Sequence, residues 1–129
     1  MTIGVTAGIE KAAKCTAAIA TQYLIAKFGA DDNTLSQAAA STDELVGVFQ
    51  HVTAAADATA RIMFTGITNV KLGGTVARGD NCTSDAAGKG VKAAPATGVN
   101  ANIVGKFLAS GVDGDIVPML LGPGVMQGA

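Results

Sequence analysis

The sequence predicts an all-β protein of short strands and hairpins with an irregular N-terminal arm. Glycine is abundant, with 17 residues among 129, and proline is scarce, with 3. Short apolar runs of strand length alternate with turn signals, a pattern that favours strands over helices. A chain of this length is expected to form one domain. We expect the arm over residues 1–19 and the β-rich domain over residues 20–129.

The first expected hairpin covers residues 22–39. The run QYLIAKF at residues 22–28 is rich in residues that favour strands, and the cluster GADDN follows it at residues 29–33. Gly, Asp and Asn accept left-handed backbone angles, and Asp and Asn also bond to nearby backbone groups. The cluster therefore predicts a turn, and residues 34–39 are the returning strand.

Four further strands are expected in two similar pairs. LVGVFQH at residues 45–51 aligns with NIVGKFL at residues 102–108 through shared Val, Gly and Phe positions. Each is followed by a loop and a second apolar run, ARIMFTGI at 60–67 and DIVPML at 115–120. The second loop contains GVDG at residues 111–114, a good hairpin connection. Each pair is therefore expected to form a β-hairpin.

Two glycines and one proline inside these strands carry further expectations. Gly47 and Gly105 occupy matching places in the first strand of each pair. A glycine there often marks a bulge or a close approach of two backbones. Pro118 cannot donate a ladder hydrogen bond, so its strand is expected at a sheet edge.

Residues 73–91, GGTVARGDNCTSDAAGKGV, contain a tripeptide that also serves as an adhesion signal. Nothing in the chain indicates the extracellular setting that such a signal requires. Paired glycines and the stretches RGDN and SDAAG instead predict tight turns of a β-meander, with Asp and Asn capping loop amides. We therefore interpret Arg78, Gly79, Asp80 and Gly88 as structural turn residues.

Residues 1–19 have no clear strand pattern. The Ala-rich stretch 8–20 is compatible with a short helix that exposes Glu10, Lys11 and Lys14, with an extended arm that orders against a partner, or with a frayed terminus. We do not expect a signal peptide, because Glu10 lies in the would-be basic region and Thr and Gln interrupt the apolar stretch.

The composition predicts a subunit of a larger assembly. Hydrophobic residues make up 49% of the chain, but aromatic residues only 4% and charged residues only 15%. Much of the apolar total is Ala, which removes little area from water, so the core gains less per residue than one of Leu, Ile and Phe. A weak core beside a weakly charged, apolar surface indicates that other subunits cover part of that surface.

Charge and hydropathy argue against two classes of partner. The net charge is −1 and the nine Lys and Arg residues are scattered, so we expect no nucleic acid partner. No apolar run approaches the length of a membrane-spanning helix, so we expect no membrane partner.

Cys15 and Cys82 belong to no metal or redox motif. They are expected to be reduced, small hydrophobic residues, with a single disulfide as the alternative.

We expect no catalytic, cofactor-binding or metal-binding residues. His51 is the only histidine, without a nearby His or Cys for a metal or a nucleophile motif beside it. Asp31, Asp32, Asp113 and Asp115 fall in turns and lack the spacing of a calcium loop. No glycine-rich loop has the strand-to-helix context of a phosphate site. The alternative is a small ligand-binding or hydrolytic β-barrel that uses these turn carboxylates and His51.

Three stretches, in this order and spacing, carry a resemblance to a known family: YLIAKFGADDNTLSQAAASTDELVGVF, TGITNVKLGGTVARGDNCTSDAAGKGV and GDIVPMLLGPG. Through them, from about residue 20 to the C-terminus, the chain resembles the small head-decoration, or capsid cement, proteins of tailed bacteriophages. The N-terminal segment is the most variable part of that family, so residues 1–19 are not covered.

The resemblance implies a small β-barrel or β-tulip-like domain, and a structural virion protein rather than an enzyme. It would bind the outside of the icosahedral capsid as a homotrimer at threefold and quasi-threefold positions, cementing neighbouring capsomers and stabilising the mature head. The implied partners are the major capsid protein and other copies of the chain, and no cofactor is implied. The protein would be made in the bacterial cytoplasm and located on the capsid outer surface. A tail-tube or baseplate component is a further alternative.

The first residues are the expected contact with the capsid. They lack a self-sufficient core pattern, so we expect them to lie on the coat protein and to add a strand to its edge. The expected contact residues are Met1, Thr2, Ile3, Gly4, Val5, Thr6, Ala7, Gly8 and Ile9.

Overall fold

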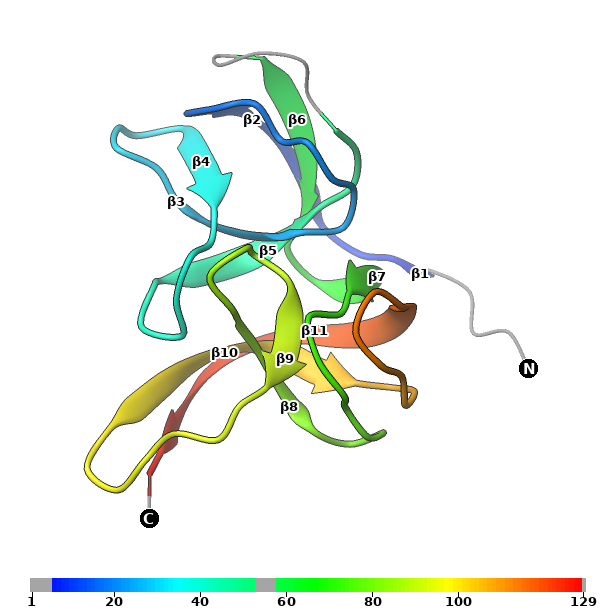
Figure 1. The fold of residues 1–129 in the computed structure, drawn as a ribbon. Coiled ribbons are helices and arrows are strands. Elements are labelled where there is room, and N and C mark those ends of the chain that lie inside the picture. Colours follow the sequence, from blue (N-terminus) through cyan, green and yellow to red (C-terminus); the bar gives the residue numbers. More distant parts are fainter. Residues whose placement is uncertain (1–5, 53–57, 129) are drawn as a thin grey trace.

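The computed structural model describes residues 6–52 and 58–128. Within them, regular secondary structure is entirely β, arranged as a barrel stacked on a twisted sheet (Figure 1). The prediction of an all-β fold with a small barrel is confirmed. No helix in the described ranges is long and apolar enough to cross a membrane.

The barrel closes through five strands in the order β2-β4-β3-β5-β6, with β6 pairing back to β2. The pairs are antiparallel except β2 with β4, which is parallel. The strands are β2 (Glu10–Cys15), β3 (Ile25–Phe28), β4 (Thr34–Gln37), β5 (Leu45–Phe49) and β6 (Thr59–Met63).

The second layer is a six-stranded antiparallel sheet in the order β1-β7-β11-β10-β8-β9. Its strands are β1 (Thr6–Ala7), β7 (Gly66–Lys71), β8 (Asn81–Ser84), β9 (Gly90–Lys92), β10 (Asn100–Phe107) and β11 (Ile116–Gln127). In Figure 1, β1 lies at one end of this layer, and the far ends of β10 and β11 form a ribbon at the other end.

Two hydrophobic clusters form the core, and β5 belongs to both. Val48 packs in the cluster between barrel and sheet, with Phe107 and Met119. Phe49, the next residue, packs inside the barrel with Ile62. Successive strand residues point to opposite faces, so one strand supplies both clusters. Phe49 and Phe107 are fully buried, so each cluster contains one fully buried aromatic ring.

The expected hairpins are confirmed. β3 pairs with β4, β5 with β6, and β10 with β11, all antiparallel. The two matching glycines are places of close backbone approach: a Cβ on Gly47 would collide with the carbonyl oxygen of Met63, and one on Gly105 with that of Leu120. The strand register shifts beside both glycines. The weak internal repeat therefore reflects a shared geometric requirement.

The edge position expected for Pro118 is wrong. β11 lies between β7 and β10, and Pro118 is opposite Asn69 of β7. The Pro118 carbonyl accepts a hydrogen bond from the N–H of Leu108, the residue that follows β10, at 3.0 Å. The N–H and carbonyl of one strand residue point to the same neighbour, so the missing donor falls where the β10–β11 ladder ends. A central strand tolerates proline there.

The short helix considered for residues 8–20 is wrong, and the irregular arm is corrected for residues 10–15. These residues form β2, which pairs with β6 and β4 inside the barrel. Its inward side chains, Ala13 and Cys15, are buried, whereas Lys14 between them is exposed. Because the inward side chains are small, the alternation of apolar and polar residues along this strand is weak, and the sequence did not reveal the strand.

Candidate interaction surfaces

The Arg78-Gly79-Asp80 tripeptide forms a turn that leads into β8. The N–H of Asp80 donates to the carbonyl of Ala77 at 3.0 Å, and the N–H of Ala77 donates to the Asp80 carboxylate at 2.9 Å. Gly79 has φ of +95°, a value that side-chain-bearing residues rarely adopt. The Arg78 N–H donates to Ser110 Oγ at 3.1 Å. The carboxylate therefore stabilises its own turn.

Gly88 lies in the turn between β8 and β9. Its φ is +75°, and its N–H donates to the Asp85 carbonyl at 3.3 Å. One carboxylate oxygen of Asp85 accepts the N–H groups of Ala87 and Lys89, both at 2.9 Å. The Gly88 carbonyl accepts from Ile25 of the barrel at 2.8 Å, so this turn also links the two layers.

His51 and Asp115 also bond to nearby backbone. His51 Nε2 accepts the N–H of Arg61 at 3.0 Å, and its Nδ1 lies 3.0 Å from the Val52 carbonyl, which places the proton on Nδ1. The Asp115 carboxylate accepts the N–H of Val112 at 2.9 Å. No group of three or more His, Cys, Asp or Glu residues in the described part of the chain is arranged to hold a metal ion.

The two cysteines lie in different core clusters and are not joined by a disulfide. Cys15 packs inside the barrel, and Cys82 packs between barrel and sheet. Burial raises the pKa of the Cys82 thiol far above its ordinary value, so the thiol is neutral. A neutral, buried thiol behaves as a small hydrophobic side chain.

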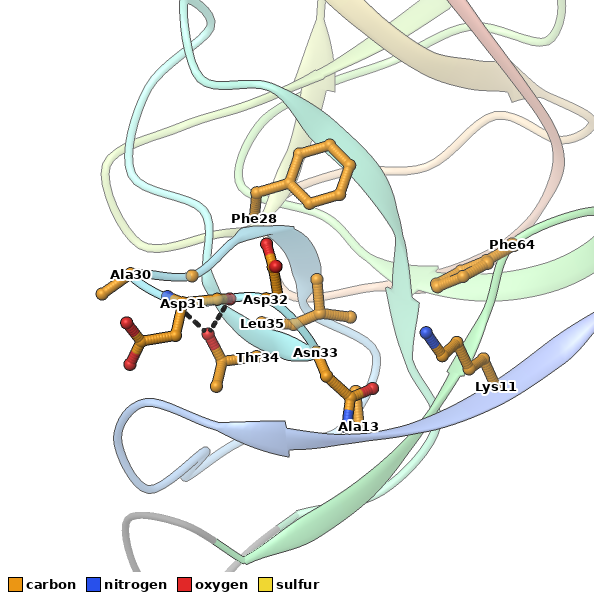
Figure 2. Close-up of a pocket in the computed structure, with 11 residues that line it drawn as sticks. Lys11, Ala13, Phe28, Ala30, Asp31, Asp32, Asn33, Thr34, Leu35 and Phe64 are labelled. Atoms are coloured by element: carbon orange, nitrogen blue, oxygen red, sulfur yellow. Dashed lines mark hydrogen bonds between the residues drawn. The ribbon is translucent and has the colours of Figure 1, made fainter.

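A groove of about 350 Å³ opens at one end of the barrel (Figure 2). Two aromatic rings line it, Phe28 from the end of β3 and Phe64 from the link between β6 and β7. Phe28 is 60% exposed, unusual for the largest side chain of its strand. Lys11 of β2 reaches into the groove beside Phe64, and Leu35 of β4 lies at its base (Figure 2).

The polar rim of the groove is the turn between β3 and β4. Thr34 Oγ1 donates to the Asp31 carbonyl at 2.6 Å and accepts the Asp31 N–H at 3.1 Å, and Asn33 has φ of +63°. Figure 2 shows the Asp31 carboxylate pointing away from the groove and that of Asp32 below Phe28. The groove brings Asp32 together with neither His51 nor Asp113.

The described part of the expected capsid contact lies at a sheet edge. Thr6 and Ala7 form β1, which pairs with β7 on one side and has no strand on its other side among the described residues. Ile9 is anchored through its backbone: its carbonyl accepts from Phe64 N–H at 2.8 Å, while its side chain is 64% exposed. Gly8 is also exposed. The other expected contact residues, Met1, Thr2, Ile3, Gly4 and Val5, lie outside the described residues.

Comparison with known proteins identifies the fold. No protein-family model matches the chain, and no curated protein matches its sequence. Among solved structures, the chain is similar to the N-terminal base of the head fibre protein gp8.5 of bacteriophage phi29. The TM-score is 0.67 at 17% sequence identity, over 88% of this chain and 93% of the other. The similarity therefore extends over nearly the whole of both chains and shows a shared β fold.

Proposed function

We propose that the chain is a structural protein of a bacteriophage virion that binds the outside of the capsid as a homotrimer and is not an enzyme. The observation that carries the proposal is the fold shared with the base of a phage head fibre along nearly the full length of both chains. His51 and Asp115, two of the residues considered for a ligand site, bond instead to nearby backbone, which supports a structural role.

The proposed mechanism is multivalent adhesion at threefold and quasi-threefold positions. Each subunit makes a modest contact with the major capsid protein, and a trimer reaches several capsomers at once. After one contact forms, the others become effectively intramolecular, so overall avidity exceeds a single affinity by roughly 10² to 10⁴. Closed threefold symmetry buries apolar subunit faces without leaving an open-ended contact. Binding only the mature shell stabilises that state by mass action.

The proposed contact is the N-terminal segment from Met1 to Ile9. β1 supports this assignment, because one of its edges pairs with no strand of the described residues and so presents backbone donors and acceptors to a partner strand. Addition of an extended segment to an exposed sheet edge is a recurring mode of recognition, in which main-chain hydrogen bonds supply affinity. The segment would lie against the edge of a coat-protein sheet.

Co-sedimentation with mature shells that lack the protein tests the proposal. The full chain should bind to saturation, whereas a variant lacking residues 2–9 should remain in the supernatant and still be a trimer. A second variant lacking residues 2–5 keeps β1 and the Ile9–Phe64 hydrogen bond, and it controls for loss of folding. Unchanged occupancy by both variants would refute the contact. Failure of the full chain to bind any shell would refute the function.

A further inference from the structure

The six-stranded sheet has an outer face that neither core cluster covers. Along β11, Val117, Met119 and Leu121 point inward and are buried, so the residues between them point outward. On β7, Thr68 and Val70 are the buried, inward residues. The outward positions of these two strands are Ile67, Asn69, Lys71, Ile116, Pro118 and Leu120.

The centre of this outer face is apolar. Ile116 is 51% exposed and Leu120 is 47% exposed, large values for side chains in the middle of a sheet. The strand register places Leu120 between Ile67 of β7 and Lys106 of β10. Pro118 lies between Ile116 and Leu120 on the same side of the strand. Together they form an apolar strip that runs along β11 and extends to β7 at Ile67.

The two charged side chains at outward positions around the strip are both positive. Asp115 directly precedes Ile116, but its carboxylate accepts the Val112 N–H of its own turn. Lys71 is opposite Ile116, and Lys106 is opposite Leu120. Neither lysine belongs to an ion pair formed by the described residues. The outward positions on β7 and β11, and the neighbouring Lys106 and Asn81, include no carboxylate. The complementary surface is therefore apolar at its centre and acidic at its rim.

A shallow hollow of about 210 Å³ lies beside Leu120 and gives this face a shape to recognise. Gly105 and Gly122 line it and contribute no side chain, while Asn81 and Lys106 supply polar groups in its wall. A single side chain of a partner fits a hollow of this size. If that partner side chain, or one next to it, is Asp or Glu, its carboxylate would lie near the Lys106 amine.

The position and the charge of the outer face both bear on which partner covers it. β1, β7 and β11 are consecutive strands, so the outer face adjoins the edge that we assign to the capsid contact (Figure 1). Two copies of the chain paired through this same face would place two lysines from each copy in one interface. Charge therefore favours a different protein over the same face of a second copy as the occupant.

We infer that the outer face of β7 and β11 docks on the major capsid protein, against an apolar patch rimmed by Asp or Glu side chains. The inference rests on the proposed function and extends it, because the contact then includes a sheet face as well as the N-terminal strand. The apolar strip supplies burial, and the two lysines orient the subunit on the shell.

Charge reversal tests the inference with the full-length protein and mature shells. The double variant K71E/K106E should lose about tenfold or more in shell affinity at low salt, because each trimer loses several favourable contacts and gains repulsive ones. The matched control K14E/K89E makes the same change in net charge on strands and turns elsewhere, and should bind as the unaltered chain does. Leu120→Asn should weaken binding without altering its salt dependence.

The outcomes separate this inference from the proposed function. If the unaltered chain binds shells and K71E/K106E binds equally well, the docking face is refuted and the function stands. If K71E/K106E or Leu120→Asn converts the trimer to monomers in solution, the face is a contact between copies and the inference is again overturned. If the unaltered chain binds no shell, the function itself fails.

Discussion

Substitution of Gly105 by Ala should destabilise the protein because two backbones meet at this position. A Cβ on Gly105 would overlap the Leu120 carbonyl oxygen, and it would lie 3.1 Å from the Leu120 carbonyl carbon and 3.0 Å from Met119 Cγ. Rotation of a side chain cannot remove the overlap with the Leu120 carbonyl, because both groups belong to the backbone or are fixed to it. The β10–β11 ladder must therefore separate locally, beside the register shift that follows Ile103.

The magnitude follows from three contributions. Overpacking at a tight site costs about 1–3 kcal/mol, and a weakened ladder hydrogen bond costs about 0.5–1.5 kcal/mol. Ala recovers about 0.5–1 kcal/mol over Gly within a strand. The free energy of unfolding should therefore fall by about 2–3 kcal/mol, which lowers Tm by about 6–15 °C for a domain of this size.

Gly122→Ala is the matched control, because it lies on the same hairpin with no heavy atom within 4 Å of the added Cβ. It should leave stability unchanged or raise it by about 0.5 kcal/mol. Thermal and urea unfolding, followed by circular dichroism at one fixed protein concentration, measures both variants. Equal loss of stability in both, or no loss in Gly105→Ala, would refute the argument from close backbone approach.

Three further predictions concern residues singled out by the sequence. His51→Ala should lower the free energy of unfolding by about 1 kcal/mol, because the Arg61 N–H loses its acceptor; an unchanged urea midpoint would contradict this. The Cys82 thiol should not react with a thiol reagent at pH 8 until the chain unfolds, because burial raises its pKa; rapid labelling of the folded protein would contradict this. Asp80→Ala should cost about 1–2 kcal/mol through loss of its bond to the turn backbone, whereas Arg78→Ala should change stability by less than about 0.5 kcal/mol; equal effects in urea unfolding would contradict the turn interpretation.

Local signals account for the part of the fold that the sequence predicted. Strands such as β3 and β5 contain β-branched and aromatic residues, and the turn at residues 29–33 has residues that accept left-handed angles. Gly47 and Gly105 were recognisable because a glycine inside an apolar run needs a geometric reason. Each of these signals lies within a few residues of the feature that it predicts.

Features set by distant parts of the chain were not predictable in this way. β2 depends on pairing with β6 and on parallel pairing with β4, and its inward Ala13 and Cys15 are too small to reveal alternation. Pro118 is tolerated in a central strand because β10 ends opposite it, and the residues around Pro118 do not reveal where β10 ends.

The groove at the end of the barrel and the outer face of β7 and β11 were also not predictable from the sequence, because they too depend on how distant strands pack. Phe28 belongs to the apolar run at residues 22–28, and nothing in that run indicates that it ends its strand at a groove. In β11, Ile116 and Leu120 alternate with the equally apolar Val117 and Met119, so both faces of the strand look alike in the sequence. Only the packing of barrel against sheet decides which face is covered.

Cryo-electron microscopy of particles from the phage that encodes the chain tests the central claim most directly. Particles with the intact gene should carry threefold density of three β domains on the outer surface of the capsid, and particles without the gene should lack it. Complete capsids of identical appearance with and without the gene would contradict the account.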